Sequence, residues 1–213
     1  MMYLSKFAYR QAVLITLCFL WSCFPFFLQD IWGKTLYKEG IMLQDPKPTL
    51  LDGFGLAVAI GSDSILVGAP HAAGLRGQVG EAFLFDRETG ELQYTFQPSS
   101  PIGDDLFGLS VCLPDQLVIV GAPRALGKMQ RPAGKVSLFD RKSGKHIRDF
   151  VSPNPTASVF GHSVATYGSW LAIGDPGAGS STKFKVGEVY VFELGTGEPV
   201  SYTHLTLPTN REV

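Results

Sequence analysis

Residues 54–70 read FGLAVAIGSDSILVGAP, and the chain contains two further copies of this pattern. The second copy, FGLSVCLPDQLVIVGAP, occupies 107–123, and the third copy, FGHSVATYGSWLAIGDP, occupies 160–176. The first residues of successive copies lie 53 positions apart in both steps. A constant period of this length is the sequence signature of a repeat architecture, in which each repeat is one unit of supersecondary structure.

Each unit predicts four short strands. In the first unit, the apolar and β-branched residues of 54–60 and 65–69 predict two strands that are buried on both faces. Residues 81–86 predict a third strand, and the more polar residues 91–97 predict a fourth strand at the outer edge of the sheet. A glycine closes the hairpin between the third and fourth strands, where a positive φ is needed. This glycine recurs as Gly90, Gly144 and Gly197.

Four antiparallel strands that recur about every 50 residues are typical of a β-propeller blade. The sequence therefore predicts an all-β fold with three four-stranded antiparallel blades within residues 53–199. The blades are expected at about 54–106, 107–159 and 160–199. A propeller ring needs at least four blades, so three blades predict a partial, open β-propeller with two uncovered apolar faces.

In these motifs the sequence resembles the FG-GAP repeats of the integrin α-subunit β-propeller and its relatives. The resemblance covers residues 54–198, about two thirds of the chain. It rests on three Phe-Gly pairs and two Gly-Ala-Pro triplets, whereas the third triplet departs as Gly174-Asp175-Pro176. The resemblance implies an exported, non-catalytic module that binds a protein or glycan ligand or mediates cell adhesion.

The motif residues have structural roles of their own. A phenylalanine at the start of an inner strand can wedge between neighbouring blades, and the glycine beside it lets two backbones approach closely. The proline after the second strand cannot donate to a ladder of hydrogen bonds, so it ends the strand. We therefore interpret these residues as scaffold and expect ligand-binding residues in the loops.

Residues 1–29 differ in composition from the rest of the chain. Lys6 and Arg10 precede the uncharged apolar run 12–28, and this order is typical of a secretory signal peptide. The alternative is a membrane anchor in the form of an N-terminal hydrophobic helix, since 17 residues lie at the short end of a bilayer span. In both interpretations the folded part is exported, and it is either secreted or held at the cell surface.

The segments on either side of the repeats are less regular. Residues 30–52 form a lead-in, in which 41–44 predict an outer strand of an otherwise missing blade. Residues 200–213, VSYTHLTLPTNREV, do not lead into a fourth copy. We interpret this tail as the product of a truncated or chimeric reading frame. The alternative is a genuine final strand, because 202–207 alternates in polarity.

Net charge and cysteine content bear on the possible partners and on disulfide bonding. The formal net charge of −1 argues against a nucleic-acid partner. Two of the three cysteines, Cys18 and Cys23, lie in the N-terminal apolar run. Cys112 is therefore expected to be a small core residue without a disulfide partner.

The loops between the second and third strands of the units contain basic residues and no acidic one. Equivalent loops of successive blades emerge at the same end, so these residues predict a basic rim that could bind an anionic partner. The rim comprises Arg76, Arg124, Lys128, Arg131, Lys183 and Lys185. The alternative is that these side chains only solubilise the loops. Asp104 and Asp105 follow in a neighbouring loop and would partly offset their charge.

The resemblance does not extend to the metal site of the family. In integrin-like blades, the loop between the first and second strands can carry a calcium-binding D-x-D-x-D-G sequence. Here the equivalent loops, 61–64, 113–116 and 166–169, contain at most one carboxylate each, and calcium needs several oxygen ligands. We therefore expect no metal and no cofactor.

Catalysis finds little support in the sequence. Motifs such as G-x-S-x-G and H-E-x-x-H are missing, and the four histidines, His71, His146, His162 and His204, occupy unrelated repeat positions. The turns FDRETGELQY and FDRKSGKHIR are similar to those of quinoprotein dehydrogenase propellers. The tryptophan of those repeats is replaced here by Tyr94, Arg148 and Ser201. The sequence thus predicts a non-enzyme. The alternative is the propeller portion of a larger surface enzyme, either a hydrolase or the accessory domain of a quinone-dependent oxidoreductase.

Overall fold

The structure is a computed structural model that describes residues 40–74, 77–101, 103–127, 131–153, 159–178 and 187–200. The chain divides into two compact units, 1–41 and 42–213, and all described strands belong to the second unit. The predicted signal peptide or anchor and the tail after Val200 lie outside the described residues. The predicted outer strand at 41–44 is wrong, because these residues are described and form no strand. In the described part of the chain, no helix is long and apolar enough to cross a membrane.

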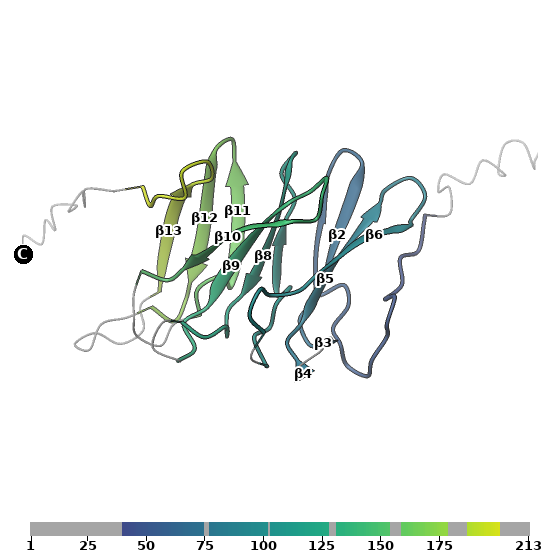
Figure 1. Ribbon diagram of the computed structural model, residues 1–213, viewed down its shortest axis with the longest axis horizontal. Helices are drawn as coiled ribbons and strands as arrows, with labels where there is room; N and C mark the ends of the chain where they lie inside the picture. Colours follow the sequence, from purple (N-terminus) through teal and green to yellow (C-terminus); the bar gives the residue numbers. More distant parts are fainter. Residues whose placement is uncertain are drawn as a thin grey trace, which may run out of the picture. The chain divides into compact units, whose positions relative to one another are not determined.

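Three antiparallel sheets make up the described structure, and each follows the preceding one along the chain (Figure 1). The first sheet has the order β1 (Ala57–Ile60), β2 (Ser64–Ala69), β5 (Glu81–Asp86), β6 (Leu92–Phe96). The second has the order β7 (Ser110–Cys112), β8 (Leu117–Ala122), β9 (Lys135–Asp140), β10 (His146–Val151). The third contains β11 (Ser163–Tyr167), β12 (Trp170–Asp175), β13 (Glu188–Glu193). A two-stranded ribbon, β3 (Ala73–Gly74) with β4 (Gly77–Gln78), lies in the loop that joins β2 to β5.

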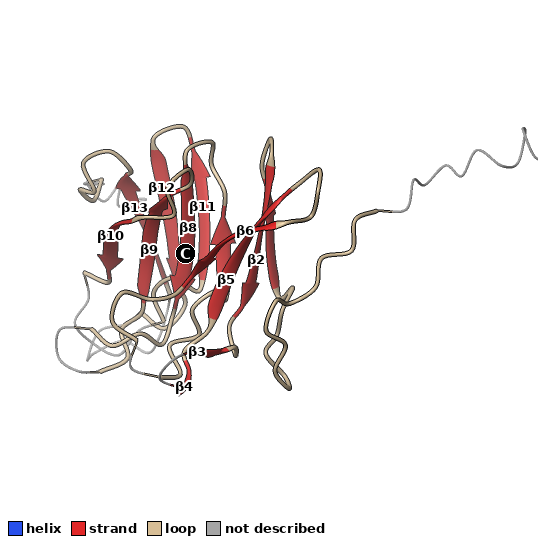
Figure 2. Ribbon diagram, turned by 45° about the vertical axis from the view of Figure 1, so that its right-hand side comes forward, coloured by secondary structure: helices blue, strands red, loops and turns tan. Residues whose placement is uncertain are grey.

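The all-β prediction is confirmed, because the described residues form strands and loops without a helix (Figure 2). The predicted third strand, 81–86, coincides with β5. Prolines follow β2, β8 and β12 directly, as expected. The predicted fourth strand of the third blade is wrong for the described residues, because the third sheet has three strands. After β13 the chain makes only an isolated bridge from Pro199 to Phe192 and a hydrogen bond from the Val200 N–H to the Val191 carbonyl (2.7 Å).

The predicted burial of the first strand on both faces is wrong. In β1 the residues alternate between half-buried and exposed, and Val58 and Ile60 are 66% and 71% exposed. The strand also begins later than predicted, at Ala57, because Phe54 and Gly55 form a turn before it. The physical reason for the exposure is that no sheet formed by the described residues covers this face of β1.

The first and second sheets pack through an apolar cluster, called here the first–second cluster. It contains Leu66 and Leu84 from the first sheet and Val118 and Phe139 from the second sheet, with Phe107 between them. Phe107 has no exposed surface, and its ring meets that of Phe139 edge to face at 6.2 Å. The predicted wedging of a phenylalanine between two sheets is confirmed at this interface.

The second and third sheets pack in the same manner through a second–third cluster. Ile119 and Leu138 come from the second sheet and Leu171 and Ile173 from the third, while Phe160 occupies the position that Phe107 has in the first–second cluster. Phe160 is also fully buried. In the first copy, by contrast, Phe54 is half-buried on the outer face of the first sheet.

The glycines of the motifs form close backbone contacts within and between the sheets. Within each sheet, the N–H of the glycine after the phenylalanine donates to the carbonyl of the glycine at the end of the second strand. These pairs are Gly55 to Gly68 (3.0 Å), Gly108 to Gly121 (3.0 Å) and Gly161 to Gly174 (3.2 Å). Between sheets, a Cβ on Gly68 would lie less than 3.0 Å from the Gly108 carbonyl oxygen, and a Cβ on Gly121 equally close to that of Gly161. Only glycine fits here, because the two backbones touch.

Candidate functional site: a polar pocket between the first and second sheets

The sheets present different loops at their two ends. The β1–β2 turn and the β5–β6 turn lie at one end of the first sheet, because β2 and β5 pair antiparallel from Ser64 and Asp86 to Ala69 and Glu81. The β2–β5 loop lies at the opposite end. The second sheet repeats this arrangement, with its β9–β10 turn at the same end as Gln116 and Leu117.

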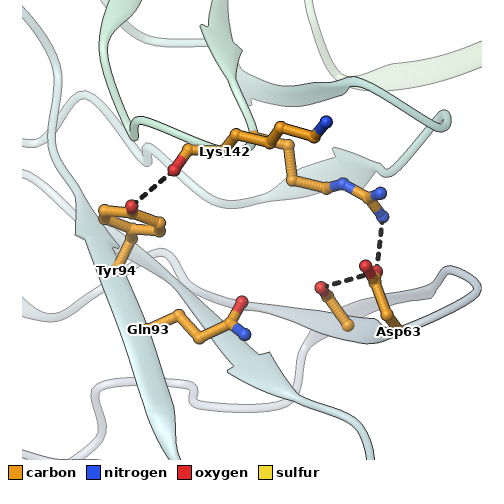
Figure 3. A pocket seen from close by; sticks show the side chains of 6 residues that line it. Asp63, Gln93, Tyr94 and Lys142 are labelled. Carbon is orange, nitrogen blue, oxygen red and sulfur yellow. Dashed lines mark hydrogen bonds and ion pairs between the residues drawn. The ribbon is translucent and has the colours of Figure 1, made fainter.

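A polar pocket of about 290 Å³ opens at the end with the short turns (Figure 3). The first sheet contributes a turn and an outer strand to it, and the second sheet contributes its β9–β10 turn. The lining residues are Asp63, Ser64, Gln93, Tyr94, Arg141 and Lys142.

Arg141 lines the pocket and joins the two sheets. Its backbone N–H donates to the Gln116 carbonyl (3.0 Å), so the second sheet fixes its position. Its side chain is 9% exposed and reaches the first sheet, where Nη1 lies 2.7 Å from Oδ1 of Asp63. The Ser64 hydroxyl donates to the same oxygen at 2.9 Å. A largely buried guanidinium needs such a partner, because an unpaired charge is costly to remove from water.

The opposite wall is held by Tyr94 of β6. The Tyr94 hydroxyl donates to the Lys142 carbonyl (2.6 Å), and its ring lies so close to Gly144 that a Cβ there would be 2.6 Å from Cδ1. The second and third sheets make an equivalent contact, in which an arginine takes the place of the tyrosine. Arg148, at the position of Tyr94, donates to the Thr196 carbonyl (2.5 Å) and the Gly195 carbonyl (3.2 Å).

The aspartate at the start of each turn beside the pocket stabilises that turn by accepting hydrogen bonds from its residues. Oδ1 of Asp86 accepts the N–H groups of Thr89 (2.8 Å) and Glu88 (2.9 Å), and these bonds lower the pKa of the Asp86 carboxyl. Oδ1 of Asp140 accepts the hydroxyl (2.5 Å) and the N–H (2.8 Å) of Ser143, which lower the pKa of the Asp140 carboxyl. The glycines that close these turns have positive φ, as predicted.

The pocket is suited to bind an anionic group. Lys142 is exposed and forms no ion pair among the described residues, while Nε and Nη2 of Arg141 have no hydrogen-bond partner there. Gln93 adds an amide. A carboxylate could bind these donors without displacing Asp63, whose own oxygens balance part of the charge.

The ion pair between Arg141 and Asp63 is expected to contribute to the free energy of unfolding. Asp63→Ala leaves the guanidinium without a partner and is expected to lower the free energy of unfolding by about 1–3 kcal/mol. Arg141→Leu is expected to cost within about 1 kcal/mol, because the Asp63 side chain is 65% exposed and its carboxylate stays hydrated when the guanidinium is removed. Leu194 already fills the equivalent position in the third sheet, against the second–third cluster. Urea unfolding followed by circular dichroism measures both changes, and equal costs would contradict the assignment.

The predicted basic rim is described only in part. Arg76, Lys128, Lys183 and Lys185 lie outside the described residues. Arg124 is paired with Asp104, with Nη1 2.6 Å from Oδ2, and both side chains are more than half exposed. Arg131 is exposed and forms no ion pair with the described residues. The acidic loop therefore offsets Arg124, and the rim remains a prediction at the end opposite to the pocket.

The histidines and Cys112 do not come together in a site. His71 and His162 are exposed, and Nε2 of His146 lies 2.7 Å from Oδ1 of Asp149. Cys112 is half-buried against the second–third cluster with its sulfur 3.2 Å from the Thr166 hydroxyl. Within the described ranges, no three His, Cys, Asp or Glu side chains are grouped as metal ligands would be.

No protein-family model matches this chain, and the search of curated proteins found no match either. The pocket itself was missed by sequence reasoning, because Asp63 and Arg141 are 78 positions apart and belong to different sheets. The only signal was that Asp63 is the single carboxylate of its turn and that the β9–β10 turn carries two adjacent basic residues.

Proposed function

We propose that this chain forms three blades of an exported β-propeller of the FG-GAP type and that it acts as a non-catalytic module that binds a protein or glycan ligand. The propeller part of the proposal is supported by the repeated interface. At both sheet-to-sheet contacts, a phenylalanine is buried and two glycine backbones touch at the motif positions. Adding sheets by the same contact extends the array as blades are added to a propeller.

The observation that carries the binding role is the pocket between the first and second sheets. Elsewhere the two sheets meet through the apolar first–second cluster, whereas here Arg141, Lys142 and Gln93 present hydrogen-bond donors to solvent. Such a donor-rich concavity fits a carboxylate of an acidic glycan or of an acidic protein side chain. Loops and turns that a rigid sheet scaffold holds in place are common positions for binding residues.

The test uses heparin, an acidic glycan, and the full chain. Lys142→Ser is expected to weaken heparin binding about two- to fivefold, because one exposed cation contributes up to about 1 kcal/mol. Binding should weaken further as salt is raised. Lys145→Ser is the matched control: Lys145 is exposed in the same hairpin but does not line the pocket, so this variant should bind heparin as the wild type does.

The triple variant Arg76→Ser, Arg131→Ser, Lys183→Ser tests the opposite end of the sheets. Weaker heparin binding in this variant alone would assign the ligand to the basic rim and remove the pocket from the proposal. Binding that is unchanged in all variants and insensitive to salt would remove both surfaces.

A further inference from the structure

The first sheet contacts the second through a backbone recess formed by Gly68, Val79 and Gly80, called here the socket. The Phe107 N–H donates to the Val79 carbonyl (3.0 Å), and a Cβ on Gly80 would lie 2.7 Å from the Phe107 nitrogen. Gly108 follows and lies against Gly68 so closely that neither residue has room for a side chain. The socket is therefore shaped for a Phe-Gly pair at the start of a strand.

The second sheet has the same socket and fills it with Phe160 and Gly161. Gly134 is bridged to Phe160, and Gly121 touches Gly161 as Gly68 touches Gly108. The Ser110 hydroxyl adds a hydrogen bond to the Gly161 carbonyl (2.7 Å). Two consecutive interfaces thus use the same positions.

The third sheet carries this socket without an occupant among the described residues. Gly174, Gly187 and Ser163 hold the positions of Gly121, Gly134 and Ser110, and they line an open cavity of about 490 Å³. A Cβ on Gly187 would have no neighbour closer than 3.5 Å. The socket is already formed, because the Ser163 hydroxyl lies beside Gly174 as that of Ser110 lies beside Gly121.

The apolar face around this cavity is equally uncovered. Val189 is 70% exposed, whereas Ala82 and Val136, its equivalents in the first and second sheets, have no exposed surface. Side chains that are buried at two interfaces are thus open at the third sheet. An apolar face of this kind indicates a surface that a further sheet covers.

The first sheet presents the complementary edge. A Cβ on Gly55 would meet no atom within 4 Å, whereas Gly108 is in contact with the sheet before it. Val58 and Ile60 are exposed, although their equivalents Val111 and Leu113 pack in the first–second cluster. Within the described ranges, the third sheet thus has an unfilled socket and the first sheet an uncovered Phe-Gly edge.

We propose that the socket of the third sheet binds the Phe54-Gly55 edge of a second copy of this chain, so that copies associate head to tail. The occupant follows from continuity: the interface would repeat the two that the chain already contains, with Val58 of one copy packed near Val189 of the other. The Ser163 hydroxyl would donate to the Gly55 carbonyl, as Ser110 donates to that of Gly161. This inference does not rest on the ligand-binding proposal.

The test is sedimentation velocity of the full chain over a concentration series. The wild type is expected to form dimers or larger assemblies, while Val189→Lys and Val58→Glu are each expected to be monomeric. Both side chains are exposed, so these variants should keep the wild-type circular dichroism spectrum. Ile147→Lys is the matched control, since Ile147 is 44% exposed on the outer strand β10 and its variant should associate as the wild type does. Ser163→Ala should weaken association about fivefold, through one lost hydrogen bond.

Mixing the two monomeric variants makes the test decisive. Val189→Lys keeps an intact first-sheet edge and Val58→Glu keeps an intact socket, so an equimolar mixture should form dimers. A mixture that stays monomeric would mean that the two faces do not bind one another and would overturn the proposal. A monomeric wild type, as expected if only a further sheet of a longer polypeptide fills the socket, would overturn it as well. So would variants that associate as the wild type does.

Discussion

Replacing Gly108 with alanine is expected to lower the free energy of unfolding by about 3–5 kcal/mol, through backbone strain and overpacking together. Gly108 has a φ of +93°, a region that costs an L-residue with a side chain about 1–2 kcal/mol. The new Cβ would also lie less than 3.0 Å from the Glu81 carbonyl oxygen and would push the first and second sheets apart. Urea unfolding followed by far-UV circular dichroism measures the loss.

The chain provides its own control for this prediction. Gly55 occupies the same position in the first copy and has nearly the same φ, +89°, but a Cβ there meets no atom within 4 Å. Gly55→Ala should therefore cost only the strain, about 1–2 kcal/mol. Equal losses in the two variants would show that the approach of the sheets contributes nothing, contrary to the role assigned to these glycines.

Phe107→Ala is expected to cost about 3–5 kcal/mol, because a fully buried ring is lost and the cavity lies between two sheets. Phe107 has no exposed surface and packs against Phe139. Phe54 makes similar ring contacts, at 5.8 Å to Phe83 and 6.1 Å to Phe85, but it is half-buried. Phe54→Ala should therefore cost about half as much.

The same urea experiment compares the two phenylalanine variants. The difference between their losses of unfolding free energy measures what packing of the ring against a second sheet contributes, because ring size and repeat position are identical. If Phe54→Ala were as destabilising as Phe107→Ala, the contacts to the neighbouring sheet would not account for the burial of the motif phenylalanines.

The repeat pattern predicted the strand order of the first two sheets and the first three strands of the third, because local pairing follows from local sequence. Residues 81–86, the glycine turns and the prolines after the second strands all lie where the pattern placed them. The burial of the first strand was predicted wrongly, since composition cannot tell how many neighbours a sheet has. Val58 and Val111 are the same residue at the same repeat position, yet only Val111 has a sheet packed over it.

The departure of the third motif from Gly-Ala-Pro has a structural reason that the sequence pattern did not reveal. In the first copy, Oδ1 of Asp52 accepts the Phe54 N–H (3.1 Å) just before the first strand. The third copy has Ser158 at the position of Asp52. There Oδ1 of Asp175 accepts the N–H groups of Val159 (3.0 Å) and Gly177 (3.2 Å) instead. The carboxylate has changed its position in the sequence while still binding the backbone beside the motif.

Tyr94 and Arg148 each donate a hydrogen bond to the turn of the following sheet, and these bonds affect the order in which the sheets unfold. The turns of the second and third sheets are each held by the sheet before them, so unfolding of one sheet should loosen the next and spread from sheet to sheet, as it does in repeat proteins. In the part of the chain that the structure describes, no earlier sheet contacts the turn of the first sheet. The amide protons of this turn and of β1 should therefore exchange with solvent fastest. The amide protons of the second sheet, which contacts a sheet on both sides, should exchange most slowly.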